Sequence, residues 1–204
     1  YFAKGIKYTL IITVVSVLIG FVLGIILALM RLGHNKLLHG LAVAYIEFIR
    51  GTPLMVQVMF VYFGIGAVIQ SLPALAAGII AVSLNSGAYV AEVIRSGIES
   101  IAIGQTEAAR SLGMSQKQTY QYVVIPQAIK YIWPALGNEF ITLIKESSIV
   151  SVIGVGDLMY QTQLVQSATY KGVAPLAITM VIYFVLTFTL SKGLNYFEGK
   201  MKHE

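Results

Sequence analysis

Three groups of polar residues interrupt hydrophobic stretches of this chain that are long enough to cross a bilayer. They are Thr52 with Pro53, Asn85 with Ser86 and Gly87, and Ser147 with Ser148. A helix break inside a membrane exposes backbone N–H and C=O groups, which only protein or a water-filled cavity can satisfy. Such groups suit the carboxylate and amino ends of an amino acid. A hydrogen bond between helices explains any single residue equally well, but the three groups together favour a transport path through a midplane cavity.

Ionisable residues in or beside the same stretches are further candidates, because a charge in lipid costs at least about 2.5 kcal/mol and normally faces a cavity or a partner. They are Glu47, Arg50, Glu92, Glu139, Lys145, Glu146 and Asp157. Glu92 can pair with Arg95, because residues three apart share a helical face. Glu47 and Arg50, also three apart, are expected to form a structural ion pair or to contact the ATPase side. Lys145 and Glu146 are adjacent and point in different directions, so each needs a partner elsewhere. The predicted substrate path comprises Thr52, Asn85, Ser86, Glu92, Ser147 and Ser148.

The elements that carry these residues are predicted to be membrane-spanning helices. The 204 residues are 57% hydrophobic and 11% charged, whereas soluble domains carry about 25% charged residues. A span needs about 20 apolar residues. We therefore predict one all-α integral membrane domain over residues 1–204, with five spans at about 8–30, 45–69, 74–97, 131–153 and 173–196. A tight turn is expected at 70–73 and an interfacial helix at 157–171. Gly20 and Gly24 are expected to permit close helix packing within one subunit, with a dimer seam as the alternative.

The distribution of Lys and Arg predicts the orientation of the bundle. With the N-terminus outside, the inner connections hold Arg31, Lys36, Arg95, Arg110, Lys117, Lys130, Lys192, Lys200 and Lys202, and the outer ones only Lys4, Lys7 and Lys171. Positively charged loops prefer the cytoplasm. Residues 99–130 and the C-terminus are therefore expected in the cytoplasm.

Residues 107–126 are polar and predict a helix-turn-helix, the one long folded loop of the chain. Gly113 stands where a helix C′ residue takes a left-handed conformation. Ser115 and Gln118 have the spacing of a capping box for a second helix. Pro126 is expected to prevent that helix from running straight on. Two short helices at an angle, held at the membrane surface, indicate a docking element for a cytoplasmic partner.

Several kinds of chemistry are excluded. The chain has no cysteine, so it has no disulfide, thiolate metal site or cysteine nucleophile. It also lacks a phosphate-binding Gly-x-x-x-x-Gly-Lys-Ser/Thr loop, so any energy for transport comes from another polypeptide or an ion gradient. His34, His39 and His203 lie in basic segments and are expected to be solvated. The basic residues flank apolar spans instead of gathering with aromatic residues, which argues against nucleic acid. We predict no catalytic residue, metal or cofactor in this chain.

The loop also carries a family resemblance. Glu107, Ala108, Ala109, Gly113, Val123, Ile125 and Pro126 resemble the Glu-Ala-Ala (EAA) loop of ATP-binding cassette (ABC) importer permeases. Segments 48–57, 88–98 and 137–148 are similar to the polar amino-acid uptake branch of that family, the His/Glu/Gln/Arg type. The resemblance implies a type I importer permease fold in a bacterial plasma membrane, with Glu107, Ala108, Ala109, Gly113 and Pro126 contacting the ATPase.

The resemblance also implies the partners. Two cytoplasmic ATP-binding subunits would bind ATP and Mg²⁺, and an external or periplasmic binding protein would deliver the amino acid to a pair of permease subunits. Whether the second permease is a copy or a paralogue stays open, as does the amino acid. An ion-coupled secondary transporter with Glu92 or Glu139 as the ion site is the alternative, but such proteins are usually built from two repeated halves. A structural membrane scaffold would leave the polar breaks unexplained.

Overall fold

The computed structural model describes residues 1–69 and 72–201, and in this part of the chain every regular element is a helix. The all-α prediction is therefore confirmed. The α-helices are α1 (Phe2–Leu32), α2 (Lys36–Arg50), α3 (Leu54–Met59), α4 (Gly66–Val68), α5 (Ala74–Glu99), α6 (Ile103–Ser111), α7 (Gln116–Thr119), α8 (Ile125–Glu146), α9 (Leu158–Thr169) and α10 (Val173–Met201). Two π-helical segments, η1 (Phe60–Ile65) and η2 (Tyr120–Val124), and a 3₁₀ helix, η3 (Ser147–Ile153), connect them. The predicted turn at 70–73 includes residues 70 and 71, which lie outside the described residues.

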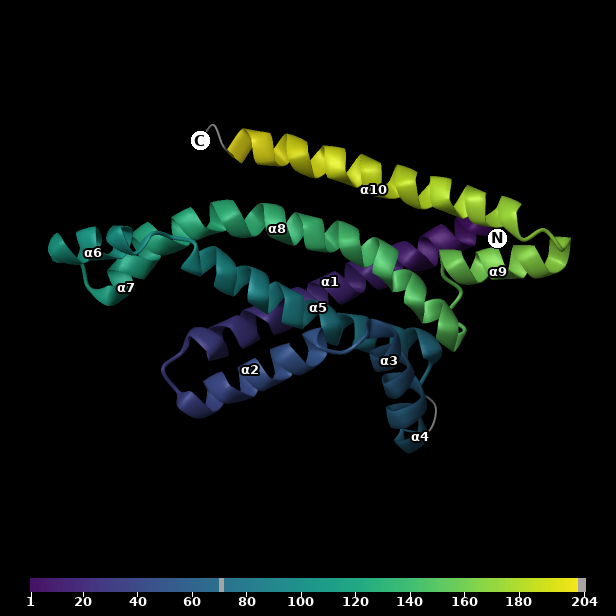
Figure 1. Ribbon diagram of the computed structural model, residues 1–204, viewed down its shortest axis with the longest axis horizontal. Coiled ribbons are helices and arrows are strands. Elements are labelled where there is room, and N and C mark those ends of the chain that lie inside the picture. The colour runs from purple at the N-terminus through teal and green to yellow at the C-terminus, as the bar shows by residue number, and fades with distance from the viewer. Residues whose placement is uncertain (70–71, 202–204) are drawn as a thin grey trace.

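The helices form an elongated bundle in which α1, α5, α8 and α10 run along the long axis (Figure 1). The N-terminus and α9 lie at one end. Helices α6 and α7 lie at the opposite end, towards which the C-terminal part of α10 also points. The docking loop and the N-terminus are thus separated by the length of the bundle, as the predicted topology requires.

In the part of the chain that the structure describes, three helices are long and apolar enough to cross a membrane: Phe2–Leu32, Ala74–Glu99 and Val173–Tyr196. The predicted span at 45–69 is not one straight helix, because Lys36–Arg50 and Leu54–Val68 meet at an angle of 104°. Pro53 has no N–H and disfavours a helical conformation in the residue before it, so the break predicted at Thr52 and Pro53 is confirmed. The predicted span at 131–153 corresponds to α8 with η3. This segment is not among the three apolar helices named above, because Lys130, Glu139, Lys145 and Glu146 lower its mean hydropathy.

Helices α1 and α5 share the most extensive contact between the described helices, and small residues permit it. A Cβ added at Gly20 would lie 2.7 Å from Ser86 Oγ, and one added at Gly87 would lie 2.7 Å from Leu23 Cδ2. The predicted interruption of the third span at residues 85–87 is wrong, because α5 runs unbroken through them. These residues are small because a neighbouring helix packs on them. Gly20 and Gly24 pack within this chain, as predicted.

Two local predictions for the loop at the far end are confirmed. Gly113 has φ +86, and Ser115 and Gln118 form a complete capping box. Pro126 does not end the helical structure, which continues from Gln116 to Glu146. The π-helical turn η2 lets the Ile125 N–H donate to Tyr120 O. Pro126 then lies in the first turn of α8, where a missing N–H leaves no intrahelical bond unmade.

Candidate translocation path and coupling loop

A polar cluster closes the break between α2 and α3. Gln57 Nε2 donates to Ile49 O at 2.7 Å, to Thr52 O at 3.1 Å and to Thr52 Oγ1 at 2.9 Å. Thr52 Oγ1 in turn donates to Phe48 O at 2.9 Å. Gln57 Oε1 accepts from Asn85 Nδ2 on α5 at 3.0 Å. One glutamine thus satisfies the carbonyls freed by the bend and ties them to α5, 28 residues further along the chain.

A cavity of about 290 Å³ adjoins this cluster. It is lined by Phe48, Ile49, Thr52, Val56, Gln57, Phe60, Val61, Ile65, Ala81 and Leu84. Its walls are almost wholly apolar, because the polar atoms of Thr52 and Gln57 bond to one another, to backbone carbonyls and to Asn85. Sequence reasoning missed Gln57, although an amide four residues after Pro53, in the charge-free stretch from residue 51 to residue 91, is a signal that could have found it.

The other predicted path residues lie apart from this cluster. Ser86 is fully buried against Gly20 of α1, and its Oγ has no hydrogen-bond partner among the described residues. Ser147 is also fully buried, and its Oγ donates to Ile144 O at 3.0 Å. Ser147 and Ser148 begin η3, whose Val150 packs against Gly78 of α5. The structure therefore brings Thr52 and Asn85 together through Gln57, and within residues 1–69 and 72–201 no hydrogen bond connects Ser86, Ser147 or Ser148 to them.

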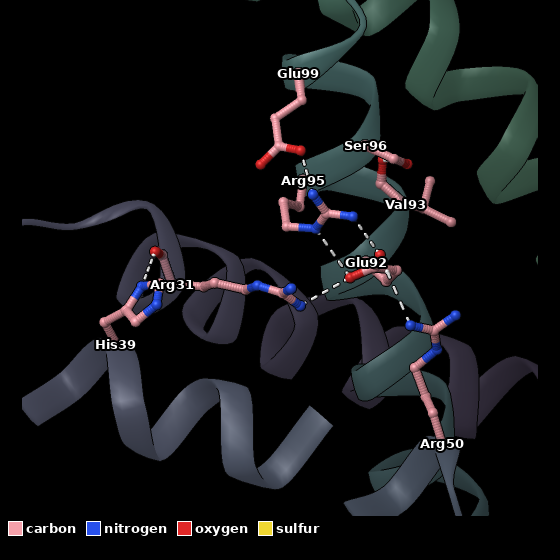
Figure 2. Close-up of polar contacts among 8 residues, drawn as sticks. All are labelled: Arg31, His39, Arg50, Glu92, Val93, Arg95, Ser96 and Glu99. Carbon is pink, nitrogen blue, oxygen red and sulfur yellow. Dashed lines mark hydrogen bonds and ion pairs between the residues drawn. The ribbon is translucent and has the colours of Figure 1, made fainter. Parts of the chain in front are cut away.

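Glu92 is the centre of an ion cluster that joins three helices (Figure 2). Its Oε2 lies 2.8 Å from Arg31 Nη1 on α1, and its Oε1 lies 2.5 Å from Arg95 Nη2 on α5 and 3.7 Å from Arg50 Nη1 at the end of α2. Arg95 also pairs with Glu99. Both carboxylate oxygens of Glu92 are therefore occupied by guanidinium groups from α1, α2 and α5.

The predicted pair of Glu92 with Arg95 is confirmed. The predicted pair of Glu47 with Arg50 is wrong, because Arg50 pairs with Glu92 and lies over the Tyr89 ring, 5.4 Å from its centroid. Arg50 is the last residue of α2, where its long side chain reaches the neighbouring helix. Glu139, the other carboxylate considered as an ion site, is half-buried on α8.

The predicted ATPase-contact residues lie on the loop that follows this cluster. Glu107 and Ala108 are exposed on α6, while Ala109 is 4% exposed and packs inward. Ile103 and Leu112 are 75% and 85% exposed at the same end of the bundle. Arg110 Nη1 donates to Met114 O at 2.7 Å across the turn at Gly113. Gln127, next to Pro126, donates from Nε2 to Gln105 Oε1 at 3.4 Å, which links α8 to α6. The loop is a folded unit with an exposed apolar tip.

No group of three or more His, Cys, Asp or Glu residues in the described part of the chain could hold a metal ion.

A helical membrane bundle with a polar helix break and a folded loop projecting from one end defines the class, a transport component that spans the membrane and contacts a partner there. A family model described as "binding-protein-dependent transport system inner membrane component" matches residues 20–203, and the chain belongs to this family.

Relatives cover almost the whole chain. The probable glutamine ABC transporter permease protein GlnM of Bacillus subtilis (strain 168) is 40% identical over 98% of this chain and 93% of its own length. The arginine transport system permease protein ArtQ of the same organism is 42% identical over 99% and 93%. This chain is accordingly the permease component of an ABC transporter. The relatives therefore favour the predicted ABC importer permease over the alternative of an ion-coupled secondary transporter.

Solved structures agree on the fold. The crystal structure of an amino acid ABC transporter with histidines contains a chain that is 50% identical, with a TM-score of 0.94, over 98% of this chain and 93% of that one. A chain of the MetNI methionine ABC transporter in an inward-facing conformation has a TM-score of 0.80 at 21% identity, over 97% and 94%. The second likeness concerns the fold alone. The predicted type I importer permease fold is confirmed.

Proposed function

We propose that this chain is the permease subunit of an ATP-driven importer of polar amino acids in a bacterial plasma membrane. The observation that supports this most directly is identity of 40% and 42%, over nearly the full length, to permeases named for glutamine and arginine transport. The cavity of about 290 Å³ beside Thr52 and Gln57 has room for a small amino acid. The same names leave the choice between neutral and cationic substrates open.

The N-terminus and α9 face outward in this proposal, and α6, α7 and the C-terminal end of α10 face the cytoplasm. The cytoplasmic part then carries most of the Lys and Arg residues, as the distribution of positive charge favours. Two ATP-binding subunits hold ATP and Mg²⁺ and receive the loops at residues 99–130. A binding protein outside delivers the amino acid. The chemistry of hydrolysis belongs to the ATP-binding subunits.

Coupling runs from the loop to the path through α5. Exposed Glu107, Ala108 and Leu112 offer a polar and apolar surface to the ATPase. The loop follows α5 directly, so a push on α6 reaches the ion cluster around Glu92 and then Asn85, about two turns further along the helix. Because Asn85 is bonded to Gln57, this movement reaches the break at Thr52. Glu92 acts here by positioning α1, α2 and α5, and Thr52 and Asn85 line the path.

Uptake into proteoliposomes tests the proposal. The permease, with its ATPase and binding protein, is reconstituted and supplied with labelled glutamine, arginine or histidine. ATP enclosed in the vesicles together with the ATPase should drive uptake. A proton or sodium gradient without ATP should not. Uptake that an ion gradient drives in the absence of the ATPase would refute the proposal in favour of a secondary transporter.

A further inference from the structure

A polar cavity of about 150 Å³ lies between α8 and α10 and shares no lining residue with the cavity at Thr52. The polar side chains that line it are Trp133 and Asn138 of α8 and Ser191, Asn195 and Glu198 of α10. Within residues 1–69 and 72–201, the side chains of Trp133, Asn138, Ser191 and Asn195 make no hydrogen bond. The cavity therefore offers donors and acceptors that this part of the chain does not use.

The charge of the lining indicates a cationic ligand. Glu198 is half-buried and is the charged residue among those that line the cavity. A primary ammonium group carries three N–H donors, which the carboxylate of Glu198 and the amide oxygens of Asn138 and Asn195 can accept. The indole ring of Trp133 also attracts a cation placed over its face. The cavity thus suits a primary ammonium group.

The cavity lies at one end of the hydrophobic thickness of the bundle. Helices α8 and α10 run antiparallel side by side (Figure 1), and a Cβ added at Gly137 would lie 3.0 Å from Leu194 Cδ1. Leu194 lies two residues before Tyr196, where the apolar span of α10 ends. Tryptophan side chains prefer this level of a membrane, where the lipid headgroups begin.

An exposed apolar stripe on α10 leads from the cavity into the span. Met180, Phe184 and Phe188 are 72%, 64% and 49% exposed. At 3.6 residues per turn, Met180 and Phe184 lie within about 60° of Ser191 around the helix. The stripe from Met180 to Ser191 is about 16 Å long at 1.5 Å per residue, and one leaflet contributes half of a hydrocarbon core of about 30 Å. The stripe therefore matches the length of one acyl layer.

A lysine lies between the stripe and the carboxylate of the cavity. Lys192 is exposed, and its Nζ lies 5.4 Å from the centroid of the Phe188 ring. Within the described part of the chain its ammonium forms no ion pair. Along α10 the order is thus apolar stripe, cation and anion. An aminophospholipid has the complementary order of acyl chain, phosphate and ammonium.

We propose that the cavity between α8 and α10 binds the headgroup of an aminophospholipid from the cytoplasmic leaflet. The ammonium contacts Glu198, the phosphate contacts Lys192, and an acyl chain lies along the stripe that includes Phe184. The inference rests on the proposed function for its orientation, which assigns this end of α10 to the cytoplasmic side. Phosphatidylethanolamine has the required N–H donors, whereas phosphatidylcholine carries methyl groups in their place and cannot donate.

A comparison of these two lipids tests the site. The complex of the chain with its ATP-binding subunits is stripped of lipid in detergent and given equal amounts of both lipids with identical acyl chains. Native mass spectrometry then counts the lipids that stay bound. Phosphatidylethanolamine should be retained over phosphatidylcholine by at least about tenfold, which corresponds to about 1.4 kcal/mol. Equal retention of the two lipids by the parent complex overturns the proposal, and this result needs no variant.

Three variants assign the contacts. Glu198→Gln should abolish the preference for phosphatidylethanolamine, because it removes the charge that holds the ammonium. Lys192→Gln should lower the retention of both lipids, since both carry the phosphate. The matched control is Glu47→Gln, which removes the same charge from an exposed position on α2 and should leave the preference unchanged. A preference that Glu198→Gln leaves intact, or that Glu47→Gln abolishes, overturns the site.

Competition separates a lipid from a free amine. Glycerophosphoethanolamine has the same headgroup without acyl chains, so it should displace the lipid only at a concentration at least about tenfold higher. Displacement at equal concentration, by this compound or by glutamine, shows that the cavity takes a free amine and overturns the lipid assignment.

Uptake into proteoliposomes distinguishes failure of this site from failure of the proposed function. ATP-driven uptake by a complex without the lipid preference overturns the lipid site and leaves the proposed function standing. A complex that prefers phosphatidylethanolamine but takes up amino acid only with an ion gradient overturns the proposed function and leaves the lipid site standing.

Discussion

Replacing Glu92 by glutamine should destabilise the bundle without weakening the binding of the amino acid. The substitution keeps the size of the side chain and removes the carboxylate that contacts Arg31 and Arg50. The side chains of Glu92, Arg31 and Arg95 are 20%, 19% and 22% exposed, so solvent screens their charges only in part. Three guanidinium groups would then converge on one amide, with Glu99 as the remaining partner of Arg95.

The size of the effect follows from this burial. Exposed ion pairs contribute about 0–1 kcal/mol, and removing one partner of a fully buried pair costs about 3–5 kcal/mol. At about one-fifth exposure an intermediate loss of about 2–3 kcal/mol is expected for Glu92→Gln. For a chain of this size 1 kcal/mol lowers the melting temperature by about 2–4 °C, so the variant should melt about 4–12 °C below the parent in detergent.

A double-mutant cycle identifies the pairs responsible. Arg31→Gln removes the partner at 2.8 Å, and its cost should overlap with that of Glu92→Gln, giving a coupling energy of about 1–2 kcal/mol. Arg50→Gln is the matched control, since Arg50 is 40% exposed and 3.7 Å away, and its coupling should stay within about 1 kcal/mol. The KM for amino-acid uptake should not change. If Glu92→Gln melts with the parent while KM rises at least about tenfold, then Glu92 contacts the substrate and the structural reasoning is wrong.

Four further outcomes are expected. Gly113→Val should uncouple uptake from ATP hydrolysis, because a β-branched residue is strained at φ +86. Gly113→Asn should stay coupled, because asparagine tolerates that conformation. Normal coupling in the valine variant would exclude the loop as the coupling element. Asn85→Leu leaves Gln57 Oε1 unpaired at a cost of about 1–3 kcal/mol and should cut uptake at least about tenfold at unchanged complex yield; full uptake would exclude this path. Asp157 caps α9 outside the spans, and burial raises its pKa to about 6. Thermal stability should therefore fall as pH rises from about 4 to 6, and Asp157→Asn, which keeps the cap, should remove this pH dependence. An unchanged pH dependence in the variant would contradict this prediction. Lys171→Cys should react with an impermeant thiol reagent in intact cells and Ser115→Cys only after permeabilisation, the reverse pattern inverting the topology.

Features governed by neighbouring residues were predictable from sequence. The capping box of Ser115 and Gln118, the left-handed Gly113 and the break at Thr52 and Pro53 each depend on a few consecutive residues. Hydrophobic length likewise located the long helices. Backbone sterics and capping hydrogen bonds act within one or two turns, so they can be inferred before any tertiary contact is known.

Contacts between distant segments decided the rest. Asn85, Ser86 and Gly87 have the composition of a helix break, but Gln57 satisfies the amide of Asn85 and α1 packs on the two small residues, so α5 stays intact. Glu92 shows no sign in sequence of its partner Arg31, which lies 61 residues away. The same polar side chain can open a helix, line a path or join two helices. Which of these it does depends on the groups that the 104° bend and the close packing of α1 on α5 bring within hydrogen-bonding distance.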